Sequence, residues 1–248
     1  MCKSFLVAIF LPLCYNFFAM KKVFENNKID IIAQVESDLL LFCDTLLEKN
    51  KQFNLTAIRE KQEVYEKHFV DSLMGKDFFT AGEKILEVGS GGGFPSVPLK
   101  IENRELDFTL LEATGKKCVF LQEIRRLFGF EKFEVVNARA EEYAKTKARE
   151  SFDIVTARAV AELSILCELC LPFLKVGGKA VFYKQKSEEE LSGGKNAVKE
   201  LGGKIVSVND YTLFSAPENV RNIIVIEKVK NTPEKYPREY KQILKRPL

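Results

Sequence analysis

The chain has 248 residues, of which 46% are hydrophobic and 29% are charged. This composition is typical of a folded globular protein and not of a disordered one. The 38 basic and 35 acidic residues give a formal net charge of +3, which excludes a histone-like protein and an acidic solvating protein. Nucleic acids, proteins and small molecules all stay open as partners.

The chain begins with a mostly apolar stretch, residues 5–19, that follows a single Lys3. This stretch resembles a weak signal peptide, but it is too short and too interrupted to span a membrane. Met20 follows at once, with two lysines after it, and has the form of an ordinary start of translation. We interpret residues 1–19 as an extension from a mis-assigned start codon, with a signal peptide as the alternative.

A helical cap is predicted over residues 20–80, before the pattern of the chain changes. Apolar residues recur at helical spacing over residues 29–49, and a second helix is predicted over residues 64–78. Short apolar runs rich in β-formers then alternate with helical patterns. The predicted strands are residues 84–88, 107–111, 133–136, 153–156, 179–183, 204–208 and 222–226. The predicted helices are residues 96–102, 116–128, 141–147, 161–174 and 188–201.

Seven strands with helical crossovers predict an α/β fold with a doubly wound, mostly parallel sheet over residues 81–229. The last two strands have no helix between them. Residues 210–220, which contain Pro217, are predicted to be a loop, so the last strand should be antiparallel. This is the topology of the Rossmann-like class I methyltransferases that use S-adenosylmethionine (SAM), not that of the six-stranded dehydrogenases.

Four of the fourteen glycines lie in the string Gly89-Ser-Gly-Gly-Gly93, between the first strand and the first crossover helix. Glycine lets a backbone approach a ligand closely, and this strand–turn–helix context is typical of nucleotide sites. Gly89 and Gly91 match the dinucleotide fingerprint, but Phe94 stands at its third glycine. With Glu87 before it, the string resembles the SAM-binding motif; a purely structural turn is the alternative.

The ends of the next three strands supply further candidates for a cofactor site. Glu112 ends the second strand, 23 residues after Gly89, where a carboxylate can accept two ribose hydroxyls of SAM or of NAD. Ala140 and Glu141 follow the third strand, where an adenine would lie. Arg158 follows the fourth strand, at the edge where open α/β sheets bind ligands. A solvated loop residue is the alternative for each charge.

The residues after the fourth strand, Thr156-Ala-Arg-Ala-Val160, narrow the acceptor chemistry. They contain neither the N-P-P-Y-like motif of exocyclic amine methylation nor a cysteine nucleophile for a pyrimidine carbon. An acceptor with its own lone pair, such as guanine N7, needs neither, because catalysis is then positioning of the nitrogen in line with the methyl group. We therefore predict no catalytic acid, base or nucleophile.

Six cysteines occur at irregular spacing, including Cys167 and Cys170 within an apolar helical run. A structural zinc site needs four ligands, whereas the chain has one histidine and no second C-x-x-C. We predict buried, reduced thiols and no metal, as is usual for a cytoplasmic protein. A metal site at these two cysteines is the alternative.

The positive charge is concentrated at the C-terminus. Residues 228–248 hold seven Lys or Arg and two Glu, which gives +5, so the first 227 residues sum to −2. Residues 230–248 are therefore predicted to form a basic tail on a nearly neutral body.

From about residue 50 to residue 238 the chain resembles the bacterial 16S rRNA guanine-N7 methyltransferases, also called glucose-inhibited division protein B. The matching strings are residues 54–58 (NLTAI), 68–73 (HFVDSL), 87–95 (EVGSGGGFP), 110–112, 116–117, 120–121, 138–141, 152–161 (FDIVTARAVA), 169–172 and 230–238 (KNTPEKYPR). Each string alone is weak, and the combination is specific. The family often has Asp where this chain has Glu87 and Glu112, and residues 1–19 have no family counterpart.

The resemblance implies a cytoplasmic enzyme that methylates N7 of one guanine in 16S rRNA or the 30S particle. We predict that it acts as a monomer. That guanine is nucleotide 527 in the usual numbering. The resemblance also implies SAM contacts at Gly89, Phe94, Ala140, Glu141 and Arg158.

Six residues are candidates for contact with the RNA. His68 shares a helix face with Asp71 and is either a structural histidine or a wall of the SAM or guanine pocket. Lys116, Lys117 and Arg125, with Arg126, lie on one predicted helix and could meet phosphates or be a solvated face. Tyr236 and Arg238 place an aromatic ring beside basic residues, a pattern that can stack a base.

Three other functions stay open. A SAM enzyme with a small-molecule or protein acceptor would act on free substrates and not on 16S rRNA. An NAD-dependent oxidoreductase is disfavoured by Phe94 at the fingerprint position. A non-catalytic SAM-binding regulator would bind the cofactor without turnover.

Overall fold

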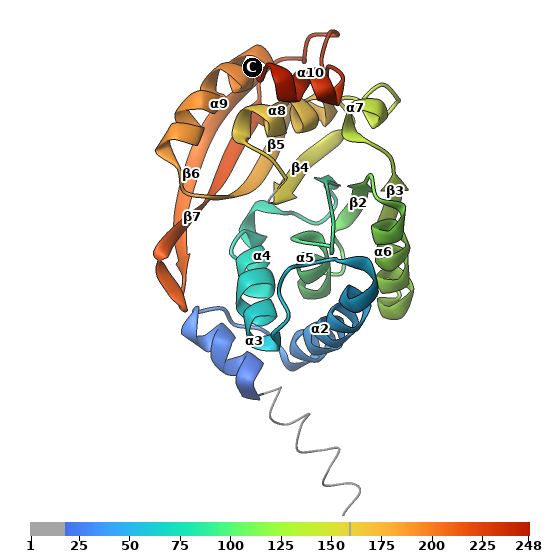
Figure 1. The fold of residues 1–248 in the computed structure, drawn as a ribbon, viewed down its shortest axis with the longest axis vertical. Coiled ribbons are helices and arrows are strands. Elements are labelled where there is room, and N and C mark those ends of the chain that lie inside the picture. The colour runs from blue at the N-terminus through green and yellow to red at the C-terminus, as the bar shows by residue number, and fades with distance from the viewer. Residues whose placement is uncertain (1–17, 159) are drawn as a thin grey trace, which may run out of the picture.

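A computed structural model describes residues 18–158 and 160–248, and its centre is one seven-stranded sheet (Figure 1). The strands are β1 (Lys84–Val88), β2 (Asp107–Glu112), β3 (Phe133–Asn137), β4 (Phe152–Arg158), β5 (Leu174–Gln185), β6 (Gly203–Leu213) and β7 (Ala216–Lys228). Their order is β3-β2-β1-β4-β5-β7-β6, and β7 runs antiparallel to both of its neighbours. The predicted fold class, with its antiparallel last strand, is confirmed.

The connection between the last two strands differs from the prediction. Residues 210–220 are not a loop: β6 and β7 continue through this stretch as one long hairpin, with Tyr211 opposite Arg221. Pro217 lies close to the turn, where the register is already irregular, so its missing N–H removes no regular ladder bond. The hairpin therefore reaches well beyond the rest of the sheet and forms a wall beside it.

Helices cover both faces of the sheet (Figure 1). The helices of the first face are α2 (Ala33–Phe53), α5 (Ser96–Glu102) and α6 (Gly115–Phe128). Those of the second face are α7 (Ala140–Tyr143), α8 (Leu163–Cys170), α9 (Glu188–Glu200) and α10 (Tyr240–Lys245). Each face has its own cluster of buried apolar side chains, so the sheet is enclosed by two hydrophobic cores.

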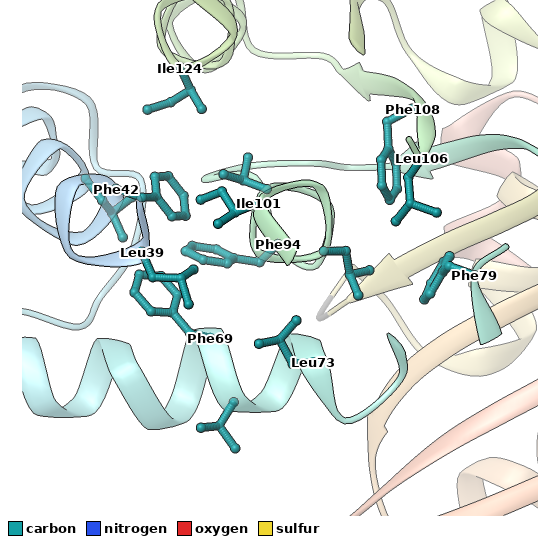
Figure 2. Packing of buried hydrophobic residues seen from close by; sticks show 14 of the residues in the cluster. Leu39, Phe42, Phe69, Leu73, Phe79, Phe94, Ile101, Leu106, Phe108 and Ile124 are labelled. Atoms are coloured by element: carbon teal, nitrogen blue, oxygen red, sulfur yellow. The ribbon is translucent and has the colours of Figure 1, made fainter. Parts of the chain in front are cut away.

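The N-terminal cap shares the first of these cores. Figure 2 shows Leu39 and Phe42 of α2 packed with Phe69 of the cap and with Phe94 beside the glycine string. Phe42 and Phe69 stack with ring centroids 5.5 Å apart, and Phe94 lies 5.5 Å from Phe42. Burial of these rings fixes the cap against the edge of the sheet that carries the glycines.

The second cap helix is not one regular helix as predicted. It divides into α3 (Lys61–Val64), a π-helical turn (Tyr65–Val70), α4 (Asp71–Leu73) and a 3₁₀ turn (Lys76–Phe78). The wider π-helical turn changes the direction of successive side chains, and such turns are frequent at functional sites. Here it carries His68 and leads directly into Asp71.

The C-terminal tail is folded onto the second face and ends in α10, a helix that the sequence analysis did not predict. The ammonium of Lys228 is buried and donates to the carbonyls of Leu171 and Leu174 and to Thr232 Oγ1. Arg149 donates to the carbonyls of Thr232 and Tyr236 at 2.8 and 2.7 Å. These bonds attach the tail to the body of the protein.

The described cysteines are core residues. Cys43, Cys118, Cys167 and Cys170 are free and buried, as predicted, and burial raises the pKa of the Cys167 and Cys170 thiols. Within residues 18–158 and 160–248 no group of three or more His, Cys, Asp or Glu could hold a metal ion. The same residues contain no helix that is long and apolar enough to cross a membrane.

The predicted extension falls mostly outside the described residues, which begin at residue 18. Residues 18–26 are helical, and Met20 and Phe24 on this helix are buried in the first core.

Candidate active site

The glycine string forms a tight turn between β1 and α5. Gly89, Gly91 and Gly93 have φ values of +73°, +54° and +86°, a region that side-chain-bearing residues rarely adopt. The amides of Gly89 and Ser90 both donate to the carbonyl of Leu111, at 2.8 and 3.2 Å, and so tie the turn to the end of β2. A Cβ atom on Gly89 would lie 2.9 Å from Val160 Cγ2, so the turn leaves no room for a side chain there.

Glu112 is held beside this turn at the end of β2. Its Oε2 accepts from the amide of Gly91 at 2.9 Å, and its Oε1 accepts from the amide of Thr114 at 2.7 Å. Each carboxylate oxygen keeps a free lone pair. The two backbone bonds therefore orient the group that can accept two neighbouring hydroxyls of a ligand.

Glu87 lies beneath the turn and is fully buried. Neither of its carboxyl oxygens has a hydrogen-bond partner among the described residues. Burial raises the pKa of this carboxyl to about 8, against smaller opposing effects of the neighbouring Ser96, whose hydroxyl lies too poorly oriented for a regular hydrogen bond, and of the positive charge of Arg158. An unpartnered buried carboxyl is rare in a folded protein, and it would be compensated by a cationic ligand in the turn.

The raised pKa of Glu87 makes the stability of the cofactor-free protein depend on pH. Because the folded chain holds this proton more tightly than the unfolded chain, stability should fall as the pH rises from about 4.5 to about 8. We expect Glu87→Gln to remove this loss. Urea unfolding of both proteins at pH 5, 6.5 and 8 measures the free energy of unfolding. The difference between the two proteins cancels the effect of the other titrating groups. If this difference is the same at all three pH values, the raised pKa of Glu87 is contradicted.

Phe94, His68 and Arg158 form a stacked group next to the turn. The His68 ring stacks on Phe94 with centroids 4.2 Å apart, and the Arg158 guanidinium lies 4.9 Å from the centre of the same ring. Arg158 Nη2 lies 2.7 Å from His68 Nδ1. His68 of the cap and Arg158 at the end of β4 thus both pack against the ring of Phe94, which follows the glycines.

These contacts fix the protonation state of His68. A guanidinium only donates, so Nδ1 accepts from Arg158 and the ring proton is on Nε2, which donates to Thr56 Oγ1 at 2.8 Å. Burial, and then the charge of Arg158, lower the pKa of His68 to about 3. His68 is therefore a neutral, fully bonded residue near pH 7.

Asp71 joins three parts of the protein, although only 1% of its surface is exposed. Its Oδ2 accepts from Arg158 of β4 at 2.7 Å. Its Oδ1 accepts from Tyr211 of β6 at 2.7 Å and from Arg221 of β7 at 3.0 Å. One buried carboxylate thus serves two guanidinium groups, and the cluster keeps a surplus positive charge.

A cavity of about 640 Å³ opens on the far side of this cluster from the glycine turn. Its walls come from the cap, from the ends of β4 and β5, and from the β6–β7 hairpin. The lining includes Lys67, His68, Asp71, Arg158, Tyr183, Lys184, Glu190, Tyr211, Ser215, Asn219 and Arg221. Arg158 and His68 belong both to this lining and to the stacked group, so they separate the cavity from the turn.

The loop after β4 is held by an ion pair in the cavity wall. Lys184 Nζ lies 2.5 Å from Glu190 Oε1 and donates to the carbonyl of Ala161 at 2.6 Å. The same Glu190 oxygen accepts from the amide of Leu163 at 2.8 Å. Because this loop also carries Val160 onto Gly89, the pair positions the segment that touches both the turn and the cavity.

The other predicted cofactor residues lie one strand further along the same edge. Ala140 and Glu141 begin α7 directly after β3, and both are buried. The last residue of β3, Asn137, is level with Glu112 in the register. The sheet therefore brings the predicted cofactor residues to one edge, which we call the cofactor edge. These residues are Gly89, Gly91, Phe94, Glu112, Ala140, Glu141 and Arg158.

The predicted phosphate contacts on α6 are divided between its two ends. Lys116 and Lys117 lie in the first turn, beside Thr114 and the cofactor edge, whereas Arg125 lies in the last turn. Arg125 stands nine positions after Lys116, which separates the two by about 14 Å along the helix. Only the two lysines are at the edge that holds the site.

Tyr236 and Arg238 are arranged differently from the prediction. The Tyr236 side chain is buried, with 6% of the residue exposed, and its hydroxyl lies 3.3 Å from Glu200 Oε1. Arg238 is bonded to the fully buried carboxylate of Glu168. Neither side chain is free to stack on a base, because both attach the tail to the second face of the sheet.

Sequence reasoning did not find Tyr211 and Arg221, and it noted Asp71 only as a neighbour of His68. Tyr211 lay in the stretch predicted to be a loop. Arg221 stands directly before the predicted strand 222–226. A charged residue at the start of an apolar strand could have identified it as a candidate site residue.

The fold and the site define a class I SAM-dependent methyltransferase. A methyltransferase from Pyrococcus furiosus superimposes with a TM-score of 0.54 at 16% identity, over 80% of this chain and 100% of the other. The [4+2]-cyclase SpnF gives a TM-score of 0.54 at 14% identity, over 79% of this chain and 96% of that one. At these identities the likeness shows the fold alone.

The chain belongs to the rRNA small subunit methyltransferase G family, whose model matches residues 35–216. The ribosomal RNA small subunit methyltransferase G of Ligilactobacillus salivarius is 44% identical over 216 residues, 84% of this chain and 89% of the relative. The protein of that name from Bacillus subtilis is 45% identical over 203 residues, 80% of this chain and 84% of the relative.

The site fits the cofactor of this family on three structural observations. The glycine turn has open space beside Gly91, where an added Cβ would meet no atom nearer than 3.8 Å. Glu112 presents a fixed carboxylate for ribose hydroxyls, and the unpartnered carboxyl of Glu87 suits a cationic ligand.

Proposed function

We propose that this protein methylates N7 of a single guanine in 16S rRNA, nucleotide 527 in the usual numbering, with SAM as donor. The observation that carries the proposal is that Arg158 and His68 lie between the glycine turn and a cavity of about 640 Å³. A cofactor in the turn and a base in the cavity would meet at this boundary. The volume is ordinary for a small-molecule or nucleotide pocket.

The protonation states around the cavity support N7 as the acceptor atom. The bound cofactor supplies a methyl group activated by its sulfonium. N7 already carries the lone pair that attacks, so the enzyme has no proton to remove and acts by alignment. Asp71 is saturated by two arginines and a tyrosine, Glu190 is paired with Lys184, and His68 is bonded at both nitrogens. None of these residues is a free general base.

Asp71 also makes Arg158 compatible with a cationic donor. A guanidinium beside a sulfonium is unfavourable unless its charge is balanced, and the carboxylate of Asp71 lies 2.7 Å from Arg158. We assign Asp71 as the residue that keeps Arg158 in place beside the cofactor.

The cofactor residues in this proposal are Gly89, Gly91, Phe94, Glu112, Ala140, Glu141 and Arg158. We further propose that the substrate is 16S rRNA, free or in the 30S particle, and that His68, Lys116 and Lys117 face it. We also propose that the protein acts as a monomer, and the ribosomal substrate supports a cytoplasmic location. The proposed domains are the cap over residues 20–80 and the methyltransferase domain over residues 81–229.

The test uses 16S rRNA and 30S particles from cells that lack this gene. The purified protein is incubated with SAM, the RNA is treated with borohydride and aniline, which cleave at 7-methylguanine, and primer extension maps the break. We expect one new break that requires the protein. Methylation at another atom, or turnover only with small molecules or proteins, would reject the proposal. SAM binding without any turnover would indicate a regulator, and binding of NAD instead would indicate an oxidoreductase.

Replacing Lys184 tests the anchor of the loop after β4. Lys184→Met removes the ammonium that holds Ala161 and Glu190, so we expect kcat/KM for rRNA to fall roughly tenfold, which corresponds to about 1.4 kcal/mol. Lys186→Met is the matched control, because Lys186 is exposed two residues along the same segment and pairs with Asp210 at the surface. Equal rates for the two variants would show that the anchor does not act on the reaction.

A further inference from the structure

The C-terminal tail is locked into one position by a buried ion pair. Glu168 of α8 is fully buried. Its carboxylate accepts three bonds from Arg238: from Nε at 2.8 Å, from Nη2 at 2.6 Å and from the backbone amide at 2.9 Å. Two-pronged pairs of this kind fix direction as well as distance. The helix that follows, α10, is thereby held against α8, with Ile243 buried beneath it.

The locked helix presents a cationic cleft. The cleft has a volume of about 270 Å³ and is lined by Arg238, Gln242, Lys245 and Arg246, without a carboxylate. Glu168 balances the charge of Arg238. Within the described part of the chain, Lys245 and Arg246 have no carboxylate at ion-pair distance. Lys245 and Arg246 therefore bring two uncompensated positive charges to the border of a hollow whose wall consists mainly of the apolar atoms of these side chains.

The first residues of α10 lie near the edge of the sheet that carries Ala140 and Glu141. The Arg139 guanidinium sits 5.9 Å from the ring centre of Tyr240 in α10, and Arg139 directly precedes Ala140 and Glu141. Lys145, after α7, pairs with Glu239 at 2.8 Å, and Figure 1 shows α10 next to α7 and α8. Lys245 and Arg246 are at the other end of α10, and the cleft shares no lining residue with the cavity of the site.

We propose that this cleft binds phosphate groups of the rRNA backbone and is a docking point separate from the acceptor cavity. A guanidinium and an ammonium are the groups that bind phosphate oxygens most strongly. Residues 1–227 carry a net charge of −2, so the body of the protein would not attract a polyanion by its net charge, and the tail supplies that attraction. This inference rests on the proposed function. It moves the predicted RNA contact in the tail from Tyr236 and Arg238 to Lys245 and Arg246.

The test removes the two free charges and leaves the Glu168–Arg238 pair intact. Lys245→Gln/Arg246→Gln is compared with Lys84→Gln/Lys132→Gln, which removes the same charge from exposed residues at the opposite edge of the sheet. Filter binding to naked 16S rRNA and to 30S particles is measured over a range of NaCl concentrations. SAM affinity is measured by calorimetry, and thermal unfolding reports the fold.

We expect the tail variant to bind naked rRNA roughly tenfold more weakly. Its plot of log affinity against log salt should be flatter by about 1.5, because two fewer counterions are released. KM for rRNA should rise in parallel, whereas SAM affinity, kcat at saturating rRNA and the unfolding temperature should stay unchanged. The control variant should match the wild type.

Three results would overturn the docking site. The tail variant could match the wild type, both variants could lose affinity equally, or the tail variant could lose affinity for 30S particles alone. The last result would assign the cleft to a ribosomal protein. A wild-type protein that neither binds nor methylates 16S rRNA would instead reject the proposed function itself, and this inference with it.

Discussion

Asp71→Asn should lower the free energy of unfolding by about 3–5 kcal/mol and abolish methyl transfer. The substitution removes the one carboxylate that two guanidinium groups share, and an uncompensated buried charge costs this much in folded proteins. Asp71 is almost fully buried, and Arg158 keeps only 11% of its side-chain surface exposed. Arg158 would then be free to leave His68 and Phe94, which breaks the boundary between the glycine turn and the cavity.

The matched control for Asp71→Asn is Asp153→Asn in β4, the strand that also carries Arg158. Asp153 also pairs with a cation, Lys175 at 2.8 Å, but its side chain is 32% exposed. Exposed pairs contribute about 1 kcal/mol or less. Urea unfolding measures both variants, and methyl transfer to 16S rRNA is assayed below the unfolding transition. A loss at Asp153 as large as that at Asp71 would show that the cluster has no special role.

Gly89→Ala should weaken SAM binding by at least about tenfold, a loss of about 1.4 kcal/mol or more. The new methyl group would lie 2.9 Å from Val160 Cγ2, so the loop after β4 must move away from the glycine turn. Alanine at a φ of +73° is also strained. Calorimetric titration with SAM measures the affinity.

Gly82→Ala separates the strain of Gly89→Ala from the collision. Gly82 has a φ of +91°, but a Cβ atom there meets nothing within 4 Å. This control carries the backbone strain without the contact, and it should bind SAM like the wild type. If the two alanine variants bind SAM equally well, the close approach of Val160 to the turn does not matter for the cofactor.

The positions of the strands were predictable because each one contains a short apolar run. The first strand was predicted at residues 84–88, and β1 has these bounds. The glycine turn and Glu112 were predictable for the same reason, since their positions follow from where β1 and β2 end. Ala140, Glu141 and Arg158 were predicted from strand ends in the same way, and the family resemblance added Phe94.

The charged cluster could not be predicted, because its contacts are remote in sequence. Asp71 bonds to residues 87, 140 and 150 positions away, and no local pattern encodes such distances. The hairpin was missed because residues 210–220 are polar and contain proline, whereas pairing with β7 overrides that local preference. In the tail, the overlooked signal was Glu168, an acid within an otherwise apolar helix.

The locked tail has a consequence for the gene that encodes this protein. A stop codon at residue 238 would leave Glu168 buried without its guanidinium, a loss of about 3–5 kcal/mol. That is comparable with the whole stability of many domains. Such a truncation removes less than a twentieth of the protein, yet the cell would lose the enzyme to misfolding and proteolysis. Late nonsense mutations should therefore behave as null alleles. A partly active enzyme that has lost only its binding to RNA should not accumulate.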